Sequence, residues 1–190
     1  MRRHHPVLLR SCRAAVILSV SVGLSAALVA GPQTPSKVPT VAPAALQTLL
    51  PAQMDGWTKA RENSDRIERA DSCTYAFADV VYTSGESKVR ITVADTGFDA
   101  DALMALATIV VTFPADHTEV IPPDTTVARS THNGAPSATL WNVSKREGEF
   151  VVVVAGRFVA KAEGTRIDGL DVLRSAIERL DLKKLAQLAQ

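Results

Sequence analysis

Hydrophobic and polar residues alternate along several short stretches of this chain, as they do in strands with one buried face. The clearest stretch is Lys88–Asp95, where valine or isoleucine occupies every second position. The stretch before it, Thr74–Thr83, is rich in aromatic and β-branched residues and is separated from it by Ser84–Ser87. Two such stretches joined by a short glycine-containing link predict an antiparallel hairpin.

Turn signals divide the second half of the chain in the same way. Asn133-Gly134, Glu147-Gly148 and Ala155-Gly156 are predicted turns, and Asn-Gly is the strongest hairpin dipeptide. The strands predicted around them are Thr125–Ser130, Ala138–Val143, Phe150–Val154 and Arg157–Glu163. Every link is too short for a parallel crossover, so the pattern predicts an antiparallel meander.

Apolar residues at helical spacing predict three helices. A short one contains Leu46 and Leu50, and a second follows Asp99 or Asp101, either of which can cap it. A third begins after a predicted Asp168 cap, with a restart at Asp181.

Two segments lack periodicity. Residues 61–72 are highly charged and predict a loop or a solvated helical turn, and residues 114–124 hold three prolines and predict a connecting loop. The order is therefore α-β-β-α-β-β-β-β-α. It predicts an α+β fold in which helices pack on an antiparallel sheet of five to six strands.

The N-terminal residues have the pattern of a secretory signal peptide. Arginines precede the apolar run Ala14–Ala30, no acid occurs before Asp55, and small residues end the run. Residues 1–30 are therefore predicted to be a signal, cleaved after Ala27 or Ala30. The apolar run of 17 residues approaches the length of a membrane span, so an uncleaved anchor is the alternative.

The expected location is periplasmic or extracellular, with membrane attachment only through an uncleaved signal. Residues 31–43 contain four prolines and predict an extended tether. Residues 44–190 are then a single domain, which is large enough to form one core without disulfide bonds.

Removal of the signal changes the charge of the protein. Four of the 21 basic residues and none of the 20 acids lie in residues 1–30, which leaves 17 basic and 20 acidic residues. A slightly acidic domain without basic and aromatic residues interleaved does not have the composition of a nucleic-acid-binding protein.

Cysteine usage gives one further candidate. Without the signal, Cys73 is the only cysteine, so no intrachain disulfide can form. We expect it to be a small buried side chain, while an intermolecular bridge or a reactive thiol are the alternatives.

The sequence lacks the signatures of the large enzyme classes. GxSxG, the Walker lysine loop, HExxH, paired CxxC and a GxGxxG after a strand are all missing. We therefore expect no catalytic residues and no cofactor. Metal binding is disfavoured because the possible ligands lie in separate loops: Asp116, His117, Glu119, Asp124 and His132.

The remaining polar candidates have structural explanations. Asp99 and Asp101 are close enough for acid–base chemistry, but helix capping explains them. A basic patch from two strands suits an anionic ligand or an acidic partner, and it also fits a solvated sheet face. Its members are Lys88, Arg90, Arg157 and Lys161.

Two tryptophans are also candidates. Trp57 and Trp141 are expected to anchor packing in or beside the core, and Trp57, next to a charged segment, has the lining of a ligand groove as its alternative role.

A few short motifs resemble a known group. Leu50-Pro51 followed by Gly56-Trp57, and later Val154–Val159 with Glu163-Gly164, resemble small uncharacterised secreted bacterial proteins. The layout is also similar to the PsbP-like α/β/α sandwich. That resemblance implies protein binding or assembly and implies no catalytic residue.

Together these features predict a secreted, non-catalytic binding or assembly module with an envelope protein as partner. The first alternative is a carrier or sensor of a small apolar ligand, suggested by the apolar runs Ile109–Phe113 and Val151–Val154. The second is an enzyme of unrecognised type that uses Cys73.

Overall fold

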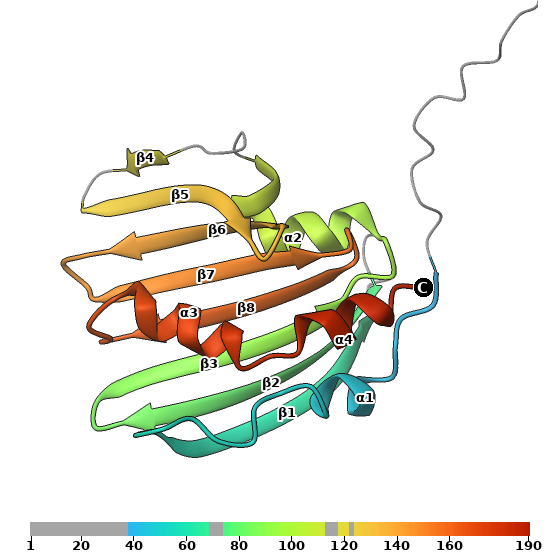
Figure 1. Cartoon of the computed structure of the whole chain (residues 1–190), viewed down its shortest axis with the longest axis horizontal. Coiled ribbons are helices and arrows are strands. Elements are labelled where there is room, and N and C mark those ends of the chain that lie inside the picture. The colour runs from blue at the N-terminus through green and yellow to red at the C-terminus, as the bar shows by residue number, and fades with distance from the viewer. Residues whose placement is uncertain (1–37, 69–73, 113–117, 122–123) are drawn as a thin grey trace, which may run out of the picture. The chain divides into compact units, whose positions relative to one another are not determined.

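An antiparallel sheet organises the described part of the chain (Figure 1). The computed structural model describes residues 38–68, 74–112, 118–121 and 124–190, which contain eight strands. These are β1 (Thr58–Glu68), β2 (Thr74–Ser84), β3 (Ser87–Asp95), β4 (Thr118–Ile121), β5 (Thr125–His132), β6 (Ala135–Asn142), β7 (Glu147–Val154) and β8 (Phe158–Thr165). They lie in the order β1-β2-β3-β8-β7-β6-β5-β4. The prediction of an α+β fold with an antiparallel sheet is confirmed.

The prediction of five to six strands is corrected to eight among the described residues, because the two edge strands were missed. β1 occupies most of the charged segment that predicted a loop, and β4 lies in the predicted connecting loop. An edge strand pairs on one side only, and charged residues on it discourage pairing with other chains. The side chains of β1 are mostly exposed, so burial leaves no alternating pattern in its sequence.

The tight turns follow the residue chemistry. Asn133-Gly134 and Ala155-Gly156 both have positive φ angles, which are 51° and 81° in the first turn and 52° and 64° in the second. In the first turn these signs fit the two-residue link that matches strand twist, since His132 pairs with Ala135. The second link has three residues, because Val154 pairs with Phe158. The predicted turn at Glu147-Gly148 is wrong, because these residues begin β7. The chain turns just before them, where Arg146 has a φ of 57°.

Helices cover both faces of the sheet (Figure 1). α1 (Pro43–Gln47), α3 (Leu170–Glu178) and α4 (Leu182–Gln187) pack on one face. α2 (Ala100–Thr112) packs on the other face, mainly over β5 to β8.

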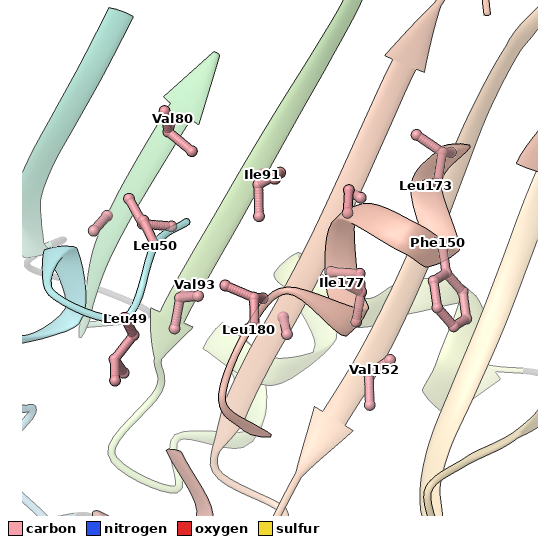
Figure 2. Close-up of a cluster of buried hydrophobic side chains, with 14 of the residues drawn as sticks. Leu49, Leu50, Val80, Ile91, Val93, Phe150, Val152, Leu173, Ile177 and Leu180 are labelled. Carbon is pink, nitrogen blue, oxygen red and sulfur yellow. The ribbon is translucent and has the colours of Figure 1, made fainter. Parts of the chain in front are cut away.

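The larger core lies under α1, α3 and α4. Figure 2 shows side chains of α3, including Leu173 and Ile177, above the apolar side chains of β2, β3 and β7. The strand residues labelled there are Val80, Ile91, Val93, Phe150 and Val152. The smaller core joins Val110 of α2 to residues of the opposite sheet face.

Aspartates cap two of the helices, whereas the cap predicted for a third helix does not form. Asp99 accepts hydrogen bonds from the backbone N–H groups of Asp101 and Ala102 at 3.0 and 3.1 Å, as an N-cap does. Asp181 caps α4 through Lys184 N at 2.9 Å. The predicted cap at Asp168 is wrong, because Gly169 precedes α3 and Asp168 is ion-paired with Arg146.

The segments predicted to export and tether the protein fall mostly outside the described residues. This applies to the predicted signal, residues 1–30, and to residues 31–37 of the predicted tether. In the part of the chain that is described, no helix is both long and apolar enough to cross a membrane. Val38–Val41, also assigned to the tether, lie against the end of the sheet.

Candidate functional site

Three members of the predicted basic patch share one sheet face. Arg90 of β3 lies opposite Glu163 of β8, and Lys161 lies opposite Thr92, so both side chains are on the same side as Lys88. Ala94, on the same side of β3, packs in the smaller core beneath α2. This side is therefore the α2 face. Its β1–β3 part lies beyond the strands that α2 mainly covers.

A buried carboxylate adds to this patch. Asp79 of β2 is 5% exposed, and its Oδ1 lies 3.5 Å from Nε of Arg90 and 3.7 Å from Nη2 of Arg61. Next to them, Nζ of Lys161 lies 3.2 Å from Oε1 of Glu163. We call these five residues from β1, β2, β3 and β8 the sheet-face cluster.

Two polar atoms of the sheet-face cluster are buried without a hydrogen bond. They are Oδ1 of Asp79 and Nε of Arg90, which attract each other as charges but do not meet hydrogen-bond geometry. Buried polar groups in folded proteins are nearly always hydrogen-bonded, so this pair is unusual. The arrangement offers an acceptor and a donor side by side.

A further carboxyl group borders the sheet-face cluster. Glu149 of β7 lies directly opposite Glu163. Burial raises the pKa of Glu149, the Lys161 ammonium opposes this, and the Glu163 carboxylate adds to it. The face therefore carries charges of both signs.

Arg157, the fourth residue of that predicted patch, lies elsewhere. It forms a two-pronged ion pair with Asp95, with Nε–Oδ1 at 2.7 Å and Nη2–Oδ2 at 2.8 Å. Asp95 also accepts from Val41 N at 2.6 Å and from Gly97 N at 2.9 Å, while Arg157 donates to Pro39 O at 3.1 Å. We call this group the N-terminal latch, because it fastens residues 38–41 to the sheet.

The surroundings of Arg157 favour its charged form. Its guanidinium carbon lies 5.6 Å from the ring centre of Phe98 and 5.0 Å from that of Phe158. The hydrogen bonds to Asp95 raise the pKa of Arg157, against the opposing effect of burial. These contacts make the residue part of the fold.

A groove opens at the end of the sheet beside the latch. It has a volume of about 1050 Å³ and lies between the β5–β6 turn, the β7–β8 turn and α4. Its apolar lining includes Val154, Leu180, Leu182 and Ala186. We call it the end groove, and its volume is at the upper end of the range for small-molecule sites.

Charged side chains edge the apolar floor of the end groove. Glu178, Asp181 and Lys183 lie at the α4 side, and all three are exposed. His132 lies at the opposite side, where its ring packs edge-on against Phe150 with 5.3 Å between the ring centres. The end groove thus combines an apolar floor with charges of both signs.

The predicted metal ligands do not converge in the described residues. There, no group of three or more His, Cys, Asp or Glu side chains could hold a metal ion. His132 lines the end groove. Asp116 and His117 lie outside the described residues, as does Cys73.

The two tryptophans contact the larger core. Trp57 and Trp141 are both half-buried and pack against it. The ring of Trp141 also lies so close to Gly148 that a Cβ there would come within 2.7 Å of it. Neither tryptophan lines the end groove.

Sequence reasoning missed Asp79, Asp95 and the end groove. Asp79 interrupts the apolar residues of β2, and Asp95 ends β3, so each was a polar residue at a position where the pattern favours burial. Such a position is a usable signal of a buried polar site. The end groove has no local signal, since two turns and a helix distant in sequence form it.

Comparison with other proteins gives no family assignment for the chain: no family model, curated protein or solved structure matches it.

Proposed function

We propose that this chain is an exported, non-catalytic binding module that holds a segment of an envelope protein in the end groove. The observation that carries the proposal is the end groove itself, an open site of about 1050 Å³ with an apolar floor and a charged edge. Interfaces of non-obligate complexes have this composition, with an apolar centre and a polar rim. Export and the non-catalytic role rest on the sequence patterns given above.

The chemistry of the edge indicates what kind of segment fits. Leu180 and Leu182 offer contacts to one or two apolar side chains, while Asp181 and Lys183 offer contacts to polar groups of either sign. A short segment with apolar residues flanked by mixed charges satisfies both requirements.

A carrier of a small apolar ligand is the second candidate. The same apolar floor supports it, because pockets for small ligands are lined mostly by apolar groups and fall in this range of volumes. The apolar runs that first suggested a carrier favour it less. Val151 and Val152 are buried in the two cores, where their contacts are with the protein itself.

Two neighbouring lysines of α4 provide a matched test. Both are exposed, but Lys183 lines the end groove and Lys184 does not. Lys183→Trp places a large ring at the groove, whereas Lys184→Trp makes the same chemical change outside it. We expect Lys183→Trp to lose at least about tenfold in partner recovery, and Lys184→Trp to keep it.

The experiment isolates each variant with its partners from the envelope of the host after chemical crosslinking. Thermal unfolding checks that both variants fold equally. Native mass spectrometry of the uncrosslinked protein separates the candidates: a bound small molecule lost only in Lys183→Trp supports the carrier. Equal recovery by both folded variants contradicts a role for the end groove.

A further inference from the structure

β1 is a long strand at an open edge of the sheet (Figure 1). It has 11 residues, whereas strands in globular proteins typically have about five to six. Among the described strands it pairs with β2 alone, so half of its backbone N–H and C=O groups point away from the sheet. It contains neither proline nor glycine. Such an edge can accept one more strand through main-chain hydrogen bonds.

The charges of β1 decide which strand can pair with it. β1 carries three basic and three acidic side chains and therefore has no net charge. They are Lys59, Arg61, Arg66, Glu62, Asp65 and Glu68. Charges on an edge discourage pairing with an arbitrary strand, because a mismatched register sets like charges against each other. They favour a strand that places opposite charges directly across from them.

A second copy of β1 has the complementary order of charges. When two β1 strands run antiparallel with Asn63 opposite Asn63 of the second copy, Arg61 of each copy lies opposite Asp65 of the other. The twofold axis through the Asn63 pair makes this contact occur twice. Residues directly opposite in an antiparallel pair have Cβ atoms about 5 Å apart, which is close enough for an ion pair.

A second pair of charges agrees with this register. Glu62 and Arg66 are on the other face of the strand, and Glu62 lies diagonally across from Arg66 of the second copy, within reach of a long side chain. A register centred on Ser64 sets Glu62 directly opposite Arg66 but places Arg61 opposite Ile67. The register centred on Asn63 therefore brings more of the opposite charges together.

Arg61 and Asp65 both have capacity for this contact. The side chain of Arg61 is 58% exposed and lies 3.7 Å from Oδ1 of Asp79, beyond hydrogen-bond distance, so its guanidinium has donors for a second carboxylate. Asp65 is exposed, and its Oδ1 accepts the backbone N–H of Arg66 at 2.7 Å. A carboxylate accepts about four hydrogen bonds, so Asp65 can also accept from an arginine.

We propose that β1 is a dimerisation strand: it pairs antiparallel with β1 of a second copy, with Asn63 on the twofold axis and two reciprocal Arg61–Asp65 ion pairs. The dimer joins the two sheets into one continuous sheet. β1 shares no residue with the end groove, so this inference does not depend on the binding role proposed for that groove.

Sedimentation velocity of the mature chain, isolated from its host, tests the proposal. Pairing through one strand buries a small interface, so the dimer is expected to be weak, and the measurement covers concentrations from about 10 µM to about 1 mM. We expect the mean mass to rise from that of the monomer toward that of the dimer. Because the ion pairs are exposed, about 1 M sodium chloride is expected to weaken the dimer several-fold.

Charge reversal assigns the dimer to β1. Arg61→Asp and Asp65→Arg each place like charges at both contacts, and each is expected to weaken the dimer about tenfold or more. An equimolar mixture of the two variants is expected to restore it, since every acidic position then faces a basic one. Asp171→Arg makes the same change as Asp65→Arg at an exposed residue of α3 and is expected to have no effect.

Thermal unfolding checks that each variant folds. If Arg61→Asp does not fold, because Asp79 lies nearby, Asn63→Lys replaces it. Asn63 is exposed, and in the proposed register residue 63 meets its own copy, so this variant sets two ammonium groups against each other. It is therefore also expected to weaken the dimer about tenfold or more.

Three outcomes overturn the proposal. The first is a parent protein that remains monomeric at the highest concentration. The second is a dimer that folded Asp65→Arg and Asn63→Lys variants leave unchanged, which assigns the contact to another surface. The third is a mixture of folded Arg61→Asp and Asp65→Arg variants that forms no dimer, which shows that these two positions do not face each other.

Discussion

Two aspartate–arginine pairs in this sheet use the same residue types in different ways. In the N-terminal latch, Asp95 and Arg157 are joined by two hydrogen bonds of 2.7 and 2.8 Å, and backbone N–H groups satisfy the remaining oxygen lone pairs. In the sheet-face cluster, Asp79 and Arg90 are 3.5 Å apart and leave two buried atoms without hydrogen bonds.

The difference separates a fully hydrogen-bonded ion pair from one held by charge attraction alone. A buried charge pair is tolerated when hydrogen bonds satisfy all of its groups, and the latch meets this condition. The sheet-face cluster does not meet it within the described residues, so its Asp79–Arg90 pair should stabilise the fold less than the latch does. Burial differs as well, because the side chain of Arg157 is 8% exposed whereas that of Arg90 is 39% exposed.

Removing the arginine of each pair should produce the largest contrast. Arg157→Met leaves Asp95 buried without its counter-ion, and we expect a loss of about 3–5 kcal/mol in the free energy of unfolding. Arg90→Met removes a partner that makes no hydrogen bond to Asp79, and we expect a loss of about 1 kcal/mol or less. Urea unfolding of both variants measures this.

Equal losses in the two methionine variants would contradict the comparison, since they would show that both arginines contribute similarly to folding. A larger loss for Arg90→Met would reverse it.

A glycine in the latch gives a smaller effect with a close control. Gly97 has a φ of 57°, its carbonyl accepts from Val38 N, and an added Cβ would lie 2.3 Å from Val38 O. Gly85 has the same φ of 57° with no atom within 4 Å of an added Cβ. We expect Gly85→Ala to cost about 1 kcal/mol, the cost of the left-handed conformation, and Gly97→Ala at least about 1 kcal/mol more.

Thermal or urea unfolding of the two alanine variants checks this difference. If Gly97→Ala is no more destabilised than Gly85→Ala, then the contact between Val38 and Gly97 contributes little to the latch.

The pH dependence of stability should sharpen the description of the α2 face. Burial raises the pKa of Glu149 in the folded state, so the folded state binds its proton more tightly than the unfolded state does. The contribution of Glu149 to the free energy of unfolding is fully present below its pKa in the unfolded state, which is about 4.3. This contribution is lost as the pH rises through the pKa of Glu149 in the folded state. Glu149→Gln removes this loss, and we expect it to raise the free energy of unfolding at pH 7 by up to about 1 kcal/mol.

The gain in the free energy of unfolding from Glu149→Gln should disappear below about pH 4, where residue 149 is neutral in both the variant and the parent protein. Glu147→Gln, at an exposed residue of the same strand, is the control and should change little at either pH. Urea unfolding at the two pH values measures both variants. A variant that is less stable than the parent at pH 7 would show that the Glu149 carboxylate is well compensated.

The sequence predicted the strands whose burial leaves a local pattern. Apolar and polar residues alternate in β3 because one of its faces is in the larger core. Asn133-Gly134 predicts the turn between β5 and β6 because both residues tolerate positive φ. β1 left no such pattern, because an edge strand with exposed side chains is held by backbone pairing with β2. The cap predicted at Asp168 failed because an exposed carboxylate can pair with a distant arginine instead.

The candidate sites were less predictable than the strands. The face shared by Lys88, Arg90 and Lys161 followed from strand alternation and pairing, and the sequence grouped these residues. The sequence grouping also included Arg157, because strand alternation puts residue 157 on the same side as Lys161. In the structure, Arg157 instead forms an ion pair with Asp95 in the N-terminal latch. The end groove was not predictable, because turns of two hairpins and α4 meet there only after the sheet has formed.

Local physical chemistry in the sequence thus determined the antiparallel meander, most of its turns and the helices that cover the sheet. Those features depend on backbone preferences and on burial of one face, both of which act over a few neighbouring residues. Only the tertiary structure decided which aspartate meets which arginine and at what distance. These contacts depend on the relative positions of strands far apart in the chain, and differences below 1 Å between them separate a hydrogen-bonded latch from an unsatisfied site.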